Sequence, residues 1–328
     1  MDKIKADTPK KQHYVPQFIL RNFSFSKKHQ IFAFNKSQVK KFITTVKDSA
    51  SENGFYNLNI GGEKYTLEYK LSKLEARCGE VIKKICDDES IKNITDEDHQ
   101  FLCIFVASLL LRVKKQREVI NQLNTSMADW LKNMGIDPSS VGNFKLLEKE
   151  EIDKLHILFT DESVFDISDH LYRKHIVLLK APSGASFMIS DNPVVMYNYW
   201  PREFRGNKGV GLPGIEIQIP LSKKLSLSFI CPVFISSLIK AVDSIKTCKS
   251  SNHKISDLDK LHAEILISSI KEGMAKKVSE KIVRFYNSLQ IQDSLNYIYS
   301  DKDDFSLAED MIKRNPDITN GRVILTDL

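Results

Sequence analysis

The chain has 328 residues, enough for one large domain or two domains of medium size. Hydrophobic residues make up 42% of it and charged residues 27%, as in an ordinary globular protein and unlike a disordered or membrane-embedded one. The longest apolar run, residues 101–111, is too short to span a bilayer. We therefore expect a cytoplasmic protein without a membrane partner.

The cysteine content argues against two further classes of protein. The number of cysteines, five, is odd, and no two of them have the C-x-x-C spacing of a zinc or redox motif. A disulfide framework and a cysteine zinc site are both disfavoured. We expect the cysteines in the hydrophobic core, where they behave as small apolar side chains. They are Cys78, Cys86, Cys103, Cys231 and Cys248.

Positive charge is concentrated at the start of the chain. Residues 1–48 hold eleven lysines and arginines against three acids, a balance of +8, whereas the whole chain carries only +6. Such a region attracts phosphate backbones, because binding releases their counterions. The alternative is a solvated, lysine-rich surface. Nucleic acid is therefore one expected partner, and a protein is another.

The first predicted element is a short helix that starts at Pro16, because proline suits the first turn of a helix. Gln17 and Arg21 then share one helical face, with His13 just before it. Imidazole exchanges protons near pH ~6.5, guanidinium grips phosphate, and an amide can donate to a developing oxyanion. The trio suits attack on a phosphodiester. The alternative is a polar cluster that locks the N-terminal segment onto the domain.

The next predicted elements are three strands followed by a helical middle segment. Alternation and turn residues indicate the strands, and apolar residues at three- and four-residue steps indicate the helices. A capping box at residues 95–98 marks the start of the second helix, and Gly135 its end. The predicted elements are strands at 30–35, 41–46 and 55–58 and helices at about 66–88, 95–134 and 146–159.

From His175 the periodicity becomes that of strands, predicted at 176–179, 187–189, 194–197, 215–219 and 225–230. A second capping box, at residues 256–259, begins a final helical segment. This order favours the α+β class, with a mixed or antiparallel sheet, a helical middle segment and C-terminal helices. We expect a single domain over residues 1–328, with a mainly helical insertion at about 66–170.

Asp191 and Asn192 follow a predicted strand, where polar loop residues often form sites. Asp191 could orient His13 or hold a metal ion, and Asn192 could join Gln17 in donating to a phosphate. The alternative is an Asx turn, because Asp and Asn-Pro favour turns.

A magnesium site is a further interpretation of the same region. Asp191 precedes Glu216 of a predicted strand, and two carboxylates on neighbouring strands can hold Mg²⁺ beside a scissile phosphate. The alternation of isoleucines at residues 215–219 offers the other explanation, with Glu216 and Gln218 on the solvent face of the strand. No zinc or nucleotide-binding motif is present to favour another cofactor.

Three further polar residues are candidates for a supporting role. Glu75 and Arg112 lie on different predicted helices and are expected to form an ion pair, either structural or within the site. Asn287 lies in a predicted helix, where a polar tether is the alternative to a role in the site.

Several motifs together resemble a family of uncharacterised prokaryotic proteins, domain of unknown function family 4238. The resemblance spans most of the chain. The matching segments are His13-Tyr14-Val15-Pro16-Gln17 with Leu20-Arg21 and Phe23, Leu71-Ser72 with Glu75, Arg112, Ser190-Asp191-Asn192-Pro193, Pro220-Leu221-Ser222, Asn287 and Tyr299-Ser300.

The resemblance implies a setting in bacterial defence against phage or in toxin-like systems. From the residues we expect a nuclease-like effector with His13 as general acid or base, Arg21 on the phosphate, Gln17 and Asn192 as donors and Asp191 as the orienting group. The alternative is a non-catalytic module that binds nucleic acid or protein through the basic N-terminal surface.

Overall fold

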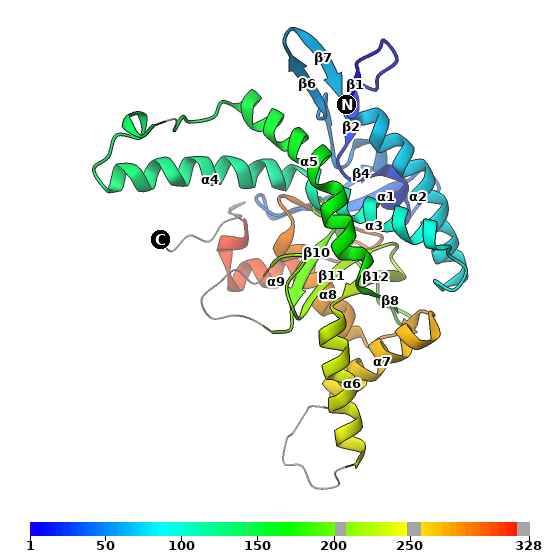
Figure 1. Ribbon diagram of the computed structural model, residues 1–328. Coiled ribbons are helices and arrows are strands. Elements are labelled where there is room, and N and C mark those ends of the chain that lie inside the picture. The colour runs from blue at the N-terminus through cyan, green and yellow to red at the C-terminus, as the bar shows by residue number, and fades with distance from the viewer. Residues whose placement is uncertain (143, 201–207, 248–256, 320–328) are drawn as a thin grey trace.

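The computed structural model describes residues 1–142, 144–200, 208–247 and 257–319 (Figure 1). The strands are β1 Asp2–Lys3, β2 Lys11–His13, β3 Gln30–Asn35, β4 Lys40–Thr45, β5 Ser51–Asn53, β6 Asn57–Ile60, β7 Glu63–Thr66, β8 His175–Lys180, β9 Ile189–Ser190, β10 Val195–Asn198, β11 Ile215–Pro220, β12 Leu225–Ile230, β13 Lys276–Lys277 and β14 Tyr297–Ser300. The helices are α1 Gln17–Arg21, α2 Glu68–Asp88, α3 Asp96–Leu111, α4 Lys114–Asn133, α5 Lys149–Tyr172, α6 Pro232–Thr247, α7 Asp257–Glu272, α8 Glu280–Asp293 and α9 Ser306–Arg314, with 3-10 turns at Val46–Asp48, Pro138–Ser140 and Pro316–Thr319.

Two larger sheets organise the strands. The first has the order β10-β11-β12-β8-β13 and is antiparallel except for β13, which runs parallel to β8. The second has the order β4-β3-β14-β9, so it joins the predicted N-terminal hairpin to a strand near the end of the chain. Mixed and antiparallel sheets with segregated helices confirm the α+β class.

Strands β11 and β12 are buried on both faces, which contradicts one expectation. Glu216 and Gln218 do not face solvent, since both side chains are buried. Helix α8 covers them: Tyr286 donates to Glu216, and Gln290 donates to Gln218. Both faces of β11 are therefore buried. The isoleucines lie on an apolar face, and Glu216 and Gln218 lie on a face where hydrogen bonds satisfy the polar groups.

The helical middle segment contains α2 to α5, and its second helix is shorter than predicted. The capping box is confirmed, since Thr95 accepts from the Asp98 N–H and Asp98 accepts from that of Thr95. The single helix expected to run to residue 134 is wrong. Val113 is extended and separates α3 from α4. Helix α3 is buried almost all round, whereas α4 leaves the body of the molecule (Figure 1), so one straight helix cannot serve both.

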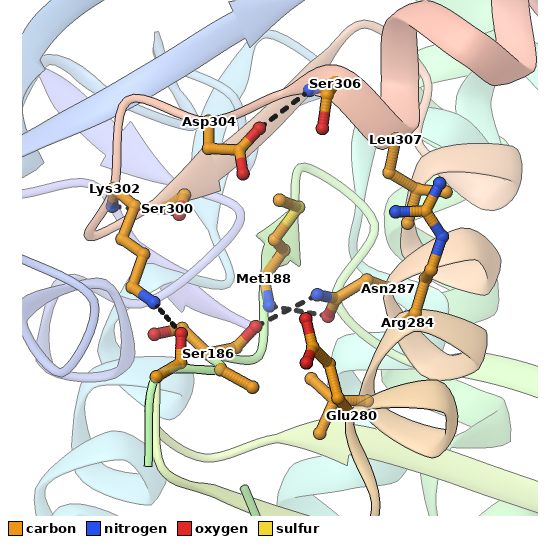
Figure 2. Close-up of a pocket in the computed structure, with 13 residues that line it drawn as sticks. Ser186, Met188, Glu280, Arg284, Asn287, Ser300, Lys302, Asp304, Ser306 and Leu307 are labelled. Carbon is orange, nitrogen blue, oxygen red and sulfur yellow. Dashed lines mark hydrogen bonds between the residues drawn. The ribbon is translucent and has the colours of Figure 1, made fainter. Parts of the chain in front are cut away.

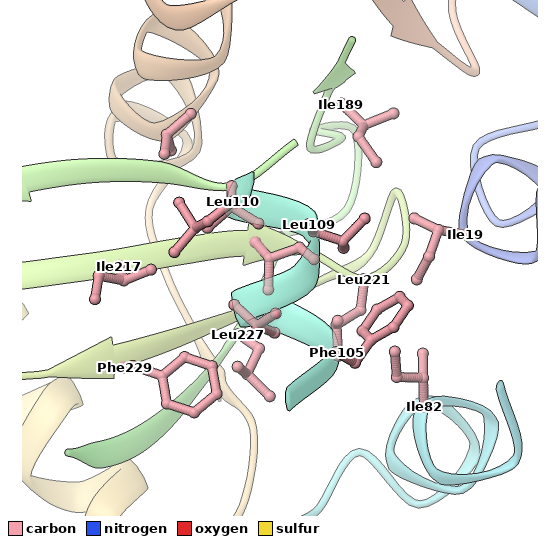
Figure 3. Packing of buried hydrophobic residues seen from close by; sticks show 14 of the residues in the cluster. Ile19, Ile82, Phe105, Leu109, Leu110, Ile189, Ile217, Leu221, Leu227 and Phe229 are labelled. Carbon is pink, nitrogen blue, oxygen red and sulfur yellow. The ribbon is translucent and has the colours of Figure 1, made fainter. Parts of the chain in front are cut away.

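Helix α3 lies at the centre of the main core. Its apolar side chains meet those of the first sheet and of helices α1 and α2 in one cluster (Figure 3). The buried residues of α1, Ile19 and Leu20, are part of that cluster and fix the N-terminal segment to the domain. No helix in the described parts of the chain is long and apolar enough to cross a membrane.

The remaining predictions of local structure had mixed outcomes. Helix α5 starts close to the predicted position but runs thirteen residues further, to Tyr172. Cys78, Cys103 and Cys231 are buried free thiols, as expected, whereas Cys86 is only half-buried. Two predicted residues, Cys248 and the helix cap Ser256, lie outside the described residues. The single-domain boundary stays a prediction.

Candidate functional site

An open cleft of about 850 Å³ lies between the N-terminal segment and helix α2. His13, Gln17 and Arg21 line one wall, and Glu68 and Glu75 line the other. Four of these five residues were candidates from the sequence, and the fold brings them together from positions up to 62 residues apart. The cleft is therefore the candidate functional site.

The first wall is a chain of hydrogen bonds along α1. Pro16 precedes the helix, so Gln17 and Arg21 stand one turn apart, as predicted. The Gln17 amide donates to His13 Nδ1 over 3.5 Å, and Arg21 Nη2 donates to Gln17 Oε1 over 3.2 Å. His13 Nε2 lies 3.1 Å from the carbonyl oxygen of Lys47. These partners suit the tautomer with its proton on Nε2 and leave the lone pair on Nδ1.

The environment of His13 favours the neutral imidazole. Burial lowers its pKa below the usual 6.5, and the positive charges of Lys11 and Arg21 lower it further. The Lys47 carbonyl and the negative charge of Asp48 raise the pKa of His13, but the net pKa remains below 6.5. Near neutral pH His13 can therefore accept a proton.

The second wall holds a carboxylic acid, Glu68, that was not among the candidates from the sequence. Glu68 begins helix α2, and burial raises its pKa to about 7, with a further rise from the negative charge of Glu75. Arg112 opposes that rise. A signal does exist in the sequence, because Glu68 and Glu75 are two turns apart on one helical face. Near neutral pH a large fraction of Glu68 is protonated.

The expected ion pair between Glu75 and Arg112 is confirmed. Arg112 Nη1 lies 2.8 Å from Glu75 Oε1, and the arginine side chain is fully buried behind the cleft wall. Among the described residues, its Nε and Nη2 have no hydrogen-bond partner. The pair joins α2 to the end of α3, so the charge of Glu75 is compensated and the wall of the cleft is fixed.

Asp191 lies elsewhere, which contradicts its expected role as the orienting group of His13. Its carboxylate accepts backbone N–H groups from Leu295, Asn296 and Tyr297 at 2.7–2.9 Å. It is buried, and burial raises its pKa against the effect of these bonds. Asp191 therefore stabilises the turn between α8 and β14. Aspartate commonly accepts backbone N–H groups in turns, and here the turn lies more than 100 residues later in the chain.

Asn192 and Asn287 serve the same part of the scaffold. The Asn192 amide donates to the carbonyl of Asp293 over 3.0 Å, so it does not reach the cleft as a phosphate donor. Asn287 accepts from the Met188 N–H over 2.8 Å and donates to the Ser186 carbonyl over 3.0 Å (Figure 2). It also borders a small pocket of about 110 Å³. Both amides are polar tethers.

The predicted magnesium ligands do not meet. The Glu216 carboxylate accepts from the hydroxyls of Tyr199 and Tyr286 at 2.7 and 2.8 Å, and that of Asp191 is engaged as above. Within the described ranges, no three His, Cys, Asp or Glu side chains are grouped so as to hold a metal ion. The residues present do not fit Mg²⁺, and we derive no step through it.

Comparison with known proteins agrees with the motifs of the sequence. The family model described as "Protein of unknown function (DUF4238)" matches residues 11–304, which include both walls of the cleft. No curated protein and no solved structure is significantly similar to the chain. The match covers most of the chain and confirms the resemblance, so the protein belongs to the DUF4238 family of proteins of unknown function.

Proposed function

We propose that this protein cleaves RNA by phosphodiester transfer in the cleft between α1 and α2. One observation carries the proposal: the cleft holds an imidazole kept neutral, a carboxylic acid with a pKa of about 7, and an arginine that donates to a neutral amide. A base, an acid and a phosphate-binding cation are the groups that this reaction needs.

In the proposed reaction the Nδ1 atom of His13 exchanges its long contact with the Gln17 amide for a ribose 2′-hydroxyl and takes the proton of that hydroxyl. The 2′-oxygen attacks the adjacent phosphorus, and the bond from phosphorus to the 5′-oxygen breaks. Glu68 gives its proton to that leaving oxygen. The products are a 2′,3′-cyclic phosphate and a 5′-hydroxyl, and water is not consumed. RNA is favoured over DNA because RNA carries this nucleophile itself.

The proposed phosphate ligand is Arg21. Its guanidinium donates to Gln17, which carries no charge, so its positive charge remains for a ligand. The other cations of the cleft are occupied: Lys11 pairs with Asp48, and Lys83 pairs with Asp87. Three of the four acids of the cleft are compensated, Glu68 in part by its proton, Glu75 by Arg112 and Asp87 by Lys83, and the fourth, Glu80, is exposed to solvent. The cleft therefore accepts one phosphate without strong repulsion.

A role in bacterial defence or as a toxin rests on the family resemblance and adds a context to this chemistry. The alternative is a non-catalytic module that binds nucleic acid or protein. Both accounts give Arg21 a ligand, but only the enzymatic one requires His13 and Glu68 to exchange protons.

The test uses purified protein and two labelled oligonucleotides of one sequence, one RNA and one DNA, each with and without EDTA. We expect cleavage of the RNA alone, unaffected by EDTA, with 2′,3′-cyclic phosphate ends. His13→Gln should slow cleavage by about 10²–10⁴-fold. His170→Gln, the same change at an exposed histidine of α5, is the matched control.

Three results would contradict the proposal. Equal cleavage of DNA would exclude the 2′-hydroxyl as nucleophile, and full activity of His13→Gln would remove His13 from the reaction. Tight RNA binding by the wild-type protein, without cleavage, would favour the binding module.

A further inference from the structure

The cleft between α1 and α2 is larger than the proposed chemistry requires. Its volume of about 850 Å³ is that of a site for a drug-sized ligand, and a phosphate with its ribose fills only part of it. Phe18 of α1 lies against Gly79 of α2, and beyond them Asn22 and Cys86 both contact the segment Leu221-Ser222. The two walls therefore run in one direction, and the cleft has a distal end beyond His13 and Glu68.

The distal end is largely apolar and carries no free charge. The charged pair beside it, Lys83 and Asp87, is joined by an ion pair of 2.9 Å. We define the distal end by five residues that line the cleft: Phe18, Asn22, Gly79, Ile82 and Cys86. Such a lining suits a flat, uncharged group, which in a nucleotide is the base.

Gly79 leaves space beside the ring of Phe18. A glycine inside a helix destabilises it relative to alanine, and the backbone of Gly79 has no positive φ that would require glycine. Packing does not require it either, because a Cβ there would lie 3.8 Å from Phe18 Cδ2, an ordinary contact. An alanine methyl would instead occupy space that the glycine leaves to a ligand.

Phe18 supplies an aromatic ring at the right distance from the proposed reaction. Its ring is half-buried and is held by Phe105 of α3, with centroids 5.5 Å apart. Bases stack on aromatic side chains in many RNA-binding sites. Gly79 lies one turn, about 6 Å, after Glu75 along α2, which is within the size of one nucleotide.

Asn22 offers a hydrogen-bond acceptor beyond that ring. It lies four residues after Phe18, on the same side of α1, and its Nδ2 donates to the Leu221 carbonyl over 2.8 Å. Within the described ranges no group donates to its Oδ1. An acceptor with its own donor already engaged selects a base that presents an amino group.

We propose that the distal end binds an amino-bearing purine, the base of the nucleotide whose 2′-hydroxyl faces His13. The base stacks on Phe18, passes over Gly79 and donates its amino group to Asn22 Oδ1. A purine matches the distance from Gly79 to Cys86, seven residues or about 10 Å along α2. This specificity rests on the proposed RNA cleavage, which names the ligand.

The test uses DNA oligonucleotides of one sequence with a single ribonucleotide, so that each offers one 2′-hydroxyl. That nucleotide carries adenine, guanine, unsubstituted purine or no base. We expect kcat/KM for the better amino purine to exceed that for unsubstituted purine about 3–10-fold, through one hydrogen bond. It should exceed that for the abasic ribose at least about 10-fold, through stacking.

Two variants locate the effect in the distal end. Gly79→Ala should raise KM for the better amino purine about 10-fold or more, leave the abasic oligonucleotide unchanged and not lower Tm. Phe18→Leu should reduce the preference for a base over no base. Phe101→Leu is its matched control, because Phe101 is also half-buried but belongs to α3 and does not line the cleft.

A binding measurement separates failure of the subsite from failure of the chemistry. Fluorescence anisotropy compares the same oligonucleotides with a 2′-O-methyl group in place of the 2′-hydroxyl. Cleavage at equal rates with and without a base would overturn the subsite and leave the proposed function standing. Binding that prefers an amino purine, is lost in Gly79→Ala and occurs without cleavage would support the subsite and contradict the chemistry. Equal binding of all four oligonucleotides would overturn the subsite in either case.

Discussion

His13 and Glu68 face one cleft. The pKa of His13 is lowered and the pKa of Glu68 is raised, and each shift favours the protonation state that the proposed role of the residue requires. Activity needs neutral His13, which dominates above a pKa that burial holds below 6.5, and protonated Glu68, which dominates below about 7. We therefore expect a bell-shaped pH profile of kcat/KM that falls on the alkaline side near pH 7. Glu68→Gln should lower kcat by about 10²–10⁴-fold and remove the alkaline limb. Glu80→Gln, an exposed acid of the same cleft, should leave the profile unchanged.

Asp191 illustrates a residue whose chemistry serves the fold. Asp191→Ala removes the acceptor of three backbone N–H groups, of which that of Leu295 is buried and those of Asn296 and Tyr297 are half-buried, and a buried unsatisfied group costs about 1–3 kcal/mol. We expect the free energy of unfolding, measured in urea, to fall by about 2–4 kcal/mol. His13→Ala should change it by less than about 1 kcal/mol, because the His13 ring makes only an exposed bond to Lys47 and a long one to Gln17. Equal losses in the two variants would place His13 in the scaffold with Asp191.

At the scale of elements, the pair between Glu75 and Arg112 positions α2 against α3. Arg112→Met leaves the half-buried Glu75 carboxylate without its counter-charge. Breaking a fully buried pair costs about 3–5 kcal/mol, and because Glu75 lines the open cleft we expect a smaller loss, about 1–3 kcal/mol. The double variant Glu75→Leu with Arg112→Met should recover most of that loss, because no unpaired charge remains. Urea unfolding of the four members of this cycle measures the coupling. Additive losses would show that the pair contributes no coupling to stability.

Elements that depend on neighbours in sequence were predictable. The hairpin of β3 and β4, the Thr95 capping box and the contacts from His13 to Arg21 all arise from residues within a few positions of one another. The break at Val113 was not predictable, because helical periodicity continues through it and only tertiary packing requires a change of direction.

The candidate site was likewise predictable where it depends on residues close in sequence and not where it depends on the tertiary fold. One wall was identified from spacing, and Glu75 and Arg112 were identified as a pair across two helices. Glu68 was missed because its pKa depends on burial, which one sequence does not reveal. Asp191 was assigned to the wrong place because its partners begin 104 residues later, at Leu295. Contacts at that separation depend on the whole fold.

At the scale of the whole molecule, the +8 balance of residues 1–48 overstates the charge that a nucleic acid would meet. Several of its cations are already engaged in the fold. Lys36 is buried, and ion pairs join Lys3 to Glu63 and Lys41 to Asp303, two acids that lie outside residues 1–48.

We therefore expect a shallow salt dependence of binding to single-stranded RNA. Each phosphate contact contributes about −0.7 to the slope of log K against log salt, and two or three contacts would give a slope of about −2. Arg21→Ala should reduce the magnitude of that slope by about 0.7, because it removes the proposed phosphate ligand of the cleft. Lys28→Ala, at an exposed turn of the same basic region, should leave the slope unchanged. Fluorescence anisotropy with a non-cleavable 2′-O-methyl oligonucleotide measures both. A slope steeper than about −5, insensitive to Arg21→Ala, would mean that the broad basic surface does the binding.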